Sequence, residues 1–327
     1  MPVTKVGSRW DRTSFEGSLD FFRKDTGDSL MTISEGGVSF PNPYGGLDYY
    51  VDGNVSATGS TGLSWGDAFL TLAEAITASN TSIGLTANRW WARRNRIFVC
   101  GDQEIDEDLT VLPEKCDVIG IGYDVEAFPR VLGNHVIGDA YSGCRFINMG
   151  FMSTAAGPVF TIPANCHGFS IIGGAMWPRN AGSTIGVSIT HCAHVNFIGL
   201  RMGIAVGAPS TGIFATGVSI LGTAGSHNTV IDGCDIQATC GVLVAATSAP
   251  YNSYIKNCII HATAETITDS SDLFHVVNNR LISDATVALA AGAGGITCNE
   301  LLASGNKIGG KDTVTNADYP FVIQLTS

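Results

Sequence analysis

The feature that most restricts the fold of this chain is a six-residue frame that recurs eight times between residues 118 and 308. Each copy has an apolar residue, a Gly or Asn two positions later, and, three positions after that, a second apolar residue. Gly and Asn tolerate a left-handed backbone, so we expect a turn between two strands at each copy. The copies are Val118/Gly120/Tyr123, Phe146/Asn148/Phe151, Ile171/Gly173/Met176, Phe197/Gly199/Met202, Ile231/Gly233/Ile236, Ile255/Asn257/Ile260, Val277/Asn279/Ile282 and, weaker at its first position, Ala303/Gly305/Ile308.

The spacing of these copies predicts a solenoid. Their Gly or Asn positions lie 22–34 residues apart, a length typical of stacked coils. Leucine-rich repeats have a similar length, but their leucine and asparagine spacing is missing. Helix-length periodicity is also missing, which excludes ankyrin and tetratricopeptide arrays. The sequence therefore predicts an all-β chain with a parallel β-helix of about eight coils over residues 97–310, and an extra loop within 203–226.

Composition and a second strand signal agree with this interpretation. Charged residues make up only 14% of the chain, and 40 residues are Gly. Long amphipathic helices need a charged outer face, so a mainly helical fold is excluded. A second strand signal follows four of the frames, at Val159–Ile162, Val187–Ile189, Val218–Ile220 and Val242–Val244.

Residues 1–45 are predicted to form an N-terminal β arm. Leu19–Phe22 and Leu30–Ile33 suit two strands of a hairpin with a turn at Thr26–Asp28. Two lone strands are marginally stable, so the arm either docks on a partner subunit or larger assembly, or folds onto its own domain. For the docking alternative, the candidate contact residues are Phe21, Phe22, Arg23 and Met31.

Residues 46–96 are predicted to form a lead-in segment after the linker-like Pro41–Gly46. One helix is expected at about residues 64–78, with Ser64 as N-cap and Asp67 in the capping-box position. One apolar stripe at helical spacing is expected to be buried, and it consists of Ala68, Phe69, Leu72, Ala75 and Ile76.

Residues 49–310 resemble the single-stranded right-handed β-helix superfamily, which includes pectate lyases and many tailed-phage virion proteins. The most specific segments are Tyr50–Asn54 and Ser64–Ile76. In similar proteins such a segment leads into a helix that plugs the N-terminal end of the solenoid. The resemblance implies a right-handed β-helix, and we expect residues 311–327 to supply a closing strand at Tyr319–Ile323. This fold carries both enzymes and inert structural proteins, so the fold alone leaves the function open.

Cysteine and histidine residues are predicted to be structural. Cysteines that keep phase with a repeat are expected to stack as buried interior ladders, and no Cys/His cluster has zinc spacing. His191–His194 and Asp52–Asn54 suit turns better than ligand sets. We therefore predict no metal and no cofactor. The cysteines in phase with the frame are Cys116, Cys144, Cys166, Cys192, Cys234, Cys258 and Cys298.

Carboxylates decide whether the chain is expected to be an enzyme. Glycoside hydrolysis needs two carboxylates facing one groove, and the best pair is Asp232 and Asp235; Asp269 and Asp272 could lie on a nearby face. The catalytic signatures of polygalacturonases and calcium-dependent pectate lyases are absent, so the residues favour a protein without catalytic residues. The aromatic residues that could stack on a sugar are Trp177, Tyr251 and Tyr254.

One basic and aromatic run is a candidate contact surface. Its residue types suit binding of nucleic acid or sugar, but its place before the first coil favours a contact at the junction of helix and first coil, or a subunit contact. The net charge of −11 argues against nucleic acid and anionic membranes as partners. The residues concerned are Arg89, Trp90, Trp91, Arg93 and Arg94.

Two function classes follow, and the first is favoured. It is a structural virion protein of a tailed phage, either a capsid decoration protein or a tail or fibre component. We expect it to be assembled in the host cytoplasm as a trimer and docked on the major capsid protein or another virion protein. No secretory signal is visible at the N-terminus, as a secreted lyase would need. Only nineteen residues follow Ile308, whereas similar tailspikes carry a large C-terminal domain, so we expect a capsid decoration (cement) protein. The alternative is a tailspike or pectate-lyase-like enzyme that uses Asp232 and Asp235.

Overall fold

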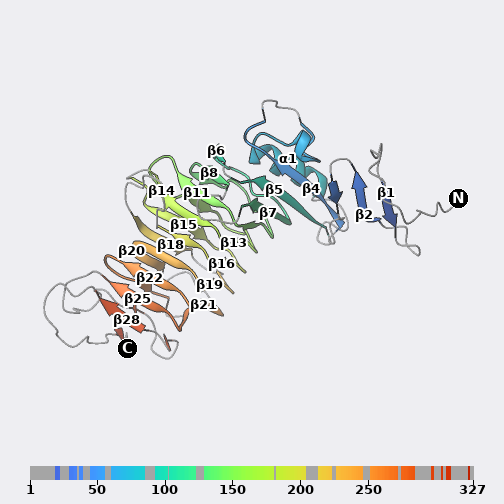
Figure 1. Cartoon of the computed structure of the whole chain (residues 1–327). Coiled ribbons are helices and arrows are strands. Elements are labelled where there is room, and N and C mark those ends of the chain that lie inside the picture. The colour runs from blue at the N-terminus through green and yellow to red at the C-terminus, as the bar shows by residue number, and fades with distance from the viewer. Residues whose placement is uncertain are drawn as a thin grey trace, which may run out of the picture.

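The structure is a computed structural model in which strands dominate and stack in parallel (Figure 1). It describes residues 45–283, except for 56–59, 85–92, 102, 123–128, 180–181, 204–212, 223–225, 246–250 and 272–273. It also describes the backbone of strands at 19–22, 29–34, 37–39, 296–297, 303–304, 307–310 and 323–324. The predicted extra loop falls partly on 204–212 and 223–225, outside the described residues.

Ten strands form the first parallel stack, and they lie side by side along the solenoid (Figure 1). Each strand pairs with the strand one coil earlier and one coil later, so the backbone groups of neighbouring coils bond to each other. In spatial order they are β4 (Gly45–Val51), β5 (Arg94–Cys100), β7 (Cys116–Ile121), β10 (Arg145–Ile147), β13 (Ser170–Ile172), β16 (Asn196–Ile198), β19 (Val230–Asp232), β21 (Ser253–Lys256), β24 (Phe274–Val277) and β27 (Ala303–Ser304).

Two further stacks join into one sixteen-stranded sheet through the long strand β20 (Asp235–Val244), whose two halves pair with different neighbours. With the first half of β20, the second stack contains β6 (Glu104–Asp106), β8 (Arg130–Leu132), β11 (Gly150–Ser153), β14 (Ala175–Pro178), β17 (Arg201–Met202), β22 (Ile259–Ala262), β25 (Arg280–Ser283) and β28 (Lys307–Gly310). With the second half of β20, the third stack contains β9 (His135–Val136), β12 (Phe160–Ile162), β15 (Ile185–Thr190), β18 (Phe214–Leu221), β23 (Ile267–Asp269), β26 (Ile296–Thr297) and β29 (Ile323–Gln324). The predicted parallel β-helix is therefore confirmed, and the second strand signals form the third stack.

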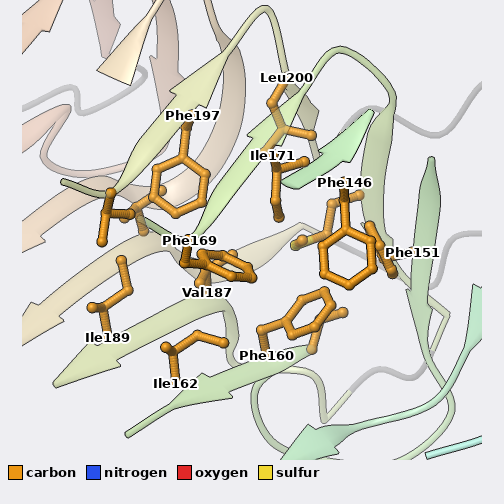
Figure 2. Packing of buried hydrophobic residues seen from close by; sticks show 14 of the residues in the cluster. Phe146, Phe151, Phe160, Ile162, Phe169, Ile171, Val187, Ile189, Phe197 and Leu200 are labelled. Atoms are coloured by element: carbon orange, nitrogen blue, oxygen red, sulfur yellow. The ribbon is translucent and has the colours of Figure 1, made fainter. Parts of the chain in front are cut away.

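The frame places its first apolar residue inside the solenoid. Phe146, Ile171 and Phe197 occupy one register position in consecutive strands and are fully buried. Figure 2 shows them packing with Phe160 and Phe169 from neighbouring segments, and the rings of Phe151 and Phe160 are 4.8 Å apart. The core therefore runs along the solenoid as continuous rows of stacked apolar side chains.

The Gly or Asn of the frame adopts the predicted left-handed backbone in five copies. The φ angles are 57° at Asn148, 65° at Gly173, 62° at Gly199, 62° at Gly233 and 55° at Asn257. In these five coils a left-handed residue directly after the first-stack strand turns the chain into the second stack, and after β13 the next residue, Gly174, is left-handed as well.

Two frames are corrected by the structure. In the seventh copy the left-handed residue is Asn278, and the fully buried pair is Val276 and Leu281, so the predicted Val277/Asn279/Ile282 is one residue late. Consecutive Val, Asn and apolar residues make the two alignments equivalent in the sequence. In the first copy Gly120 has no left-handed φ, and the residue that stacks on Phe151 is Val131. Tyr123 lies outside the described residues.

The helix starts later than predicted. A short 3₁₀ helix, η1 (Trp65–Asp67), is followed by extended Ala68, and α1 spans Leu72–Ile83. Ser64 makes no side-chain cap hydrogen bond, whereas Thr71 caps α1 and forms a capping box with Glu74. The predicted apolar stripe is buried throughout, from Ala68 to Ile76, although its first two residues precede the helix.

The helix α1 lies beside β4 and β5 (Figure 1). Side chains from neighbouring coils hold it there through hydrogen bonds. The buried amide of Asn95 donates to Ser79 O, Ser79 Oγ and Ser82 Oγ, and its oxygen accepts from Leu47 N–H. The carboxylate of Glu107 accepts from the N–H groups of Leu72 and Ala73 at the start of α1. The two bonds to Glu107 satisfy N–H groups at the start of the helix that would otherwise lack partners. Within the described part of the chain, no helix has the length and apolar character needed to cross a membrane.

Both ends of the chain contribute strands. An antiparallel sheet contains β1 (Leu19–Phe22), β2 (Ser29–Ser34) and β3 (Gly37–Ser39). Gly45 and Gly46 belong to β4, so the predicted linker ends earlier, and the first stack begins before residue 97. At the other end, β29 pairs with β26, and residues 319–322 of the expected closing strand lie outside the described residues.

Candidate functional site

Asp232 and Asp235 lie on either side of the Gly233 turn but belong to different stacks. Asp232 ends β19 and Asp235 begins β20, and both point outward because Ile231 and Ile236 are the buried neighbours. Asp232 pairs with Lys256 at 3.3 Å and accepts a hydrogen bond from Asn257 Nδ2 at 2.9 Å. The structure therefore places Asp232 in a coil-to-coil contact on the first stack.

Asp235 has a different environment. Burial raises the pKa of this carboxyl above its ordinary value, and the nearby charges of Arg201 and His261 partly oppose that rise. Its register partners on the second stack are Arg201 and Ile259. Asp232 is thus a salt-bridged carboxylate, and Asp235 holds its proton more tightly than an ordinary aspartate. The two side chains lie on different faces of the corner formed by Gly233.

Two of the three aromatic candidates for sugar stacking lie at the surface. Tyr251 is 55% exposed and Tyr254 39% exposed. Their rings stack on His227 and His275, with centroids 5.3 Å and 4.8 Å apart. Trp177 was expected outside and is only 4% exposed, because it packs in a second apolar cluster. That cluster also contains Leu132, Met152 and Ala175.

Only one member of the second aspartate pair, Asp269, lies in the described residues. Asp269 is fully buried, and its carboxylate accepts hydrogen bonds from the N–H groups of Ser271 and Phe274. These contacts hold the turn after β23. Asp272 lies outside the described residues.

The in-phase cysteines that the structure describes are buried free thiols, which confirms the predicted interior ladders. Cys192 donates to Pro163 O at 3.0 Å and Cys234 to Phe197 O at 3.3 Å, each reaching a carbonyl of the preceding coil. Burial raises the pKa of Cys116 to about 12, so this thiol stays protonated at neutral pH. The described members are Cys116, Cys144, Cys166, Cys192, Cys234 and Cys258, and Cys298 lies outside the described residues.

The predicted turns are also found. His191 and His194 have left-handed φ angles of 49° and 59° and lie between β15 and β16. The carboxylate of Asp52 accepts from Asn54 N–H at 2.9 Å and from Gln103 Nε2 at 2.7 Å, as a turn residue does. Among the described residues, no three His, Cys, Asp or Glu side chains come together in a metal-binding arrangement.

The basic and aromatic run is only partly described. Arg89, Trp90 and Trp91 lie outside the described residues, and Arg93 is exposed. Arg94 donates from Nε to Asp117 at 2.6 Å and from a terminal nitrogen to Gly143 O at 2.8 Å. Arg94 therefore connects successive coils, which agrees with the junction alternative.

The candidate contacts of the arm lie in its antiparallel sheet. Phe21 and Phe22 lie on β1, and Met31 on β2 is the register partner of Phe21. Arg23 lies outside the described residues.

The sequence interpretation missed two outward rows that run across the first stack. A charged row contains Asp48, Arg96, Asp117 and Arg145, which are register partners in consecutive strands. Two positions further along each strand lies an apolar row, hereafter the isoleucine row. It consists of Tyr50, Phe98, Ile119, Ile147, Ile172 and Ile198. The signal was present in the sequence, because Ile directly precedes the Gly or Asn in four of the frames.

Asp117 is the centre of the charged row. It accepts hydrogen bonds from Arg94 and from both Nε and a terminal nitrogen of Arg145, at 2.6–2.7 Å. Burial alone would raise the pKa of Asp117, but the hydrogen bonds from Arg145 and Arg94 outweigh it, so the pKa lies below its ordinary value.

Comparisons of this chain with protein-family models, with curated proteins and with solved structures found no match.

Proposed function

We propose that this protein is a structural virion protein of a tailed bacteriophage, a capsid decoration protein docked on the major capsid protein by residues 1–45. The observation that carries the proposal is that carboxylates and thiols, which could take part in catalysis, make structural contacts instead. Asp117 and Asp232 form ion pairs between coils, Asp269 holds a turn, and the buried thiols bond to backbone carbonyls. These groups serve cohesion of the solenoid, which suits a protein whose task is binding.

The architecture supports the same role physically. Along a parallel solenoid the strands bond to the coils before and after them, so few strand edges are left open to proteases. A decoration protein needs such durability together with a separate docking element. The antiparallel sheet of β1, β2 and β3 precedes the first stack and provides a candidate for that element. From the resemblance we expect the copies to associate as trimers.

The first test is the number of copies in a purified particle, measured by quantitative mass spectrometry against the major capsid protein. Symmetry makes the answer discrete. Hundreds of copies would support a place on the shell. About six to eighteen copies would place the protein on the tail, and absence from particles would contradict the virion role.

A second test removes residues 1–44, which leaves β4 intact from Gly45. The shortened chain is expected to keep its β-sheet circular dichroism and to lose binding to particles. A shortened chain that still decorates particles would contradict docking through the arm. The full-length chain with Val136→Lys, a change at an exposed position of the third stack, is the control.

The second candidate function is cleavage of a polysaccharide, and it is favoured by the environment of Asp235. A carboxyl whose pKa is raised by burial suits a general acid, and the salt-bridged Asp232 lies across the turn. In this case Asp235→Asn and Asp232→Asn should each abolish cleavage of the cognate polysaccharide, while Asp106→Asn, an exposed change on β6, should not. Unchanged cleavage in both variants would exclude the pair.

A further inference from the structure

The isoleucine row is an unusual outer surface for a sheet. Outward positions of a solvated strand are normally polar, yet here six consecutive strands present Tyr, Phe or Ile at one register position. Ile198 is 40% exposed, and the others are partly exposed. Trp65, 43% exposed, packs edge-on against Tyr50 at 4.9 Å and extends the row beyond β4. A continuous apolar patch of this kind marks an interaction surface.

The outer face of the third stack shows that this pattern is not a general property of the solenoid. Its outward row is mixed, and in consecutive coils it contains Val136, Thr161, Ser188, Ser219, Leu243 and Thr268. Ser188 and Ser219 are 8% and 1% exposed, so this row differs from the isoleucine row by its residue types and not by a uniformly exposed surface. The first stack differs because six consecutive strands, from β4 to β16, keep apolar residues at one outward position. Three outward apolar residues of the second stack, Leu132, Met152 and Trp177, are buried in a cluster of their own.

We propose that this face of the first stack binds the same face of a second copy of the chain, with the isoleucine rows in contact. The first reason is spacing. Side chains along the row repeat at the strand separation of about 4.8 Å, and another parallel stack has the same repeat. A second copy can therefore place one side chain opposite each side chain of the first along the whole row.

The second reason is charge. The chain carries a net charge of −11, so most of its surface repels another copy. The charged row beside the isoleucine row alternates in sign and sums to zero, from Asp48 through Arg96 and Asp117 to Arg145. A twofold axis parallel to the strands between β7 and β10 reverses the order of the row. Asp117, which is bonded to Arg94 and Arg145 of its own chain, then lies opposite Arg145 of the other copy, so like charges do not face each other at the centre of the interface.

The third reason is size and composition. Six strands at about 4.8 Å span about 24 Å, and a standard interface of about 800 Å² per partner is about 30 Å across. The N-terminal end of the row supplies Trp65, Tyr50 and Phe98, and Tyr50 stacks on Phe98 at 5.6 Å. Aromatic residues of this kind are typical anchors of interfaces. This pairing rests on the face alone and does not depend on the proposed virion role.

The test is sedimentation equilibrium of the full-length chain over a range of concentrations. The wild type is expected to contain two copies, or six if residues 1–45 also form trimers. Ile147→Lys, at the centre of the row, should weaken the pairing at least tenfold and halve the mass. Ile172→Thr keeps a β-branched side chain and should weaken the pairing less. The matched control is Val136→Lys, an equally large change at a 55% exposed position on the third stack.

Circular dichroism checks that each variant keeps the β-sheet fold. A monomeric or trimeric wild type would overturn the inference, because neither can bury this face against an identical one. Equal masses for the wild type and both row variants would also overturn it. The copy number on particles tests the virion role separately, so either proposal can fail while the other stands.

Discussion

The two halves of the ten-stranded sheet carry similar residues at their inward positions and different residues at their outward positions. Phe146 in the N-terminal half and Ile255 in the C-terminal half occupy one inward register position, and both are fully buried. On the outer face, the position of Ile198 is taken by Asp232 and then Lys256 in the next strands. Because every coil must pack on the next, the interior is constrained everywhere. The outward positions have no such packing constraint, so their residue types can differ from coil to coil.

The interiors of the two halves differ in the size of their side chains. The N-terminal half contains a cluster of phenylalanines, with Phe146, Phe151 and Phe160 within 4.8–5.9 Å of one another (Figure 2). In the C-terminal half the same inward rows hold mostly Ile and Val, such as Ile236 and Ile260. Side-chain size should therefore make the N-terminal half the more sensitive to truncation.

The largest expected effect is that of Phe151→Ala. Phe151 and Ile260 occupy the same inward row of the second stack and are both fully buried. Truncation of a buried Phe to Ala removes about 3–5 kcal/mol from the free energy of unfolding, whereas the matched Ile260→Ala, which removes fewer carbons, should remove about 2–3 kcal/mol. Urea unfolding followed by circular dichroism measures both. Equal losses would show that the N-terminal interior has no special sensitivity.

The next effect concerns His135, a histidine buried among these phenylalanines. Its Nδ1 accepts from Leu109 N–H at 3.1 Å, and burial lowers its pKa to about 4, which the charge of Asp108 only partly opposes. An unfolded histidine titrates near pH 6.5, so below that pH the unfolded chain binds a proton that the folded chain does not. The free energy of unfolding should therefore fall by about 3 kcal/mol between pH 6.5 and pH 4.

The variant His135→Asn isolates this contribution. Its side-chain oxygen can still accept from Leu109 N–H, but it does not titrate in this range. Unfolding measured at several pH values should show a shallower dependence in His135→Asn than in the wild type. His194→Asn, an exposed change in a turn, should keep the wild-type slope. An unchanged slope in His135→Asn would assign the acid sensitivity to other groups.

The smallest effect compares ion pairs on the outer face of the N-terminal and C-terminal halves of the first stack. Asp117 is 7% exposed and accepts charged hydrogen bonds from two arginines, so Asp117→Asn should cost about 2 kcal/mol of unfolding free energy. Asp232 pairs with Lys256 near the surface, at 29% and 39% exposure, and Asp232→Asn should cost less than about 1 kcal/mol. Thermal unfolding measures both variants. A larger loss of unfolding free energy from Asp232→Asn would contradict the expectation that the ion pairs of the N-terminal half are the stronger ones.

Much of the fold could be predicted from the sequence because a solenoid depends on local repeats. A left-handed Gly or Asn between two apolar residues identifies both the turn and the inward positions, as at Asn148 and Gly199. The same reasoning failed where the pattern was locally degenerate, at Asn278 and Asn279. It also failed at the helix, where Ser64 and Thr71 both suit an N-cap and tertiary packing on β4 and β5 selects Thr71.

The candidate site was harder to predict because it depends on residues from different coils. Trp177 occupies an outward register position, yet neighbours from other coils cover it, which no local pattern reveals. Asp232 and Asp235 are close in sequence, but the turn assigns them to two stacks with different partners. Periodicity predicts whether a side chain points inward or outward, but it does not predict which residues of other coils lie next to it.

The amino-acid sequence alone is sufficient for the all-β class, the coil-by-coil repeat and the buried cysteine ladders, since each follows from a short local pattern that recurs along the chain. Stacking was needed to bring Asp117 to Arg94 and Arg145, to place His135 among phenylalanines, and to align six apolar side chains into one row. These features join residues that lie 20 or more positions apart. Their energies come from contacts between coils, which exist only after the coils have stacked.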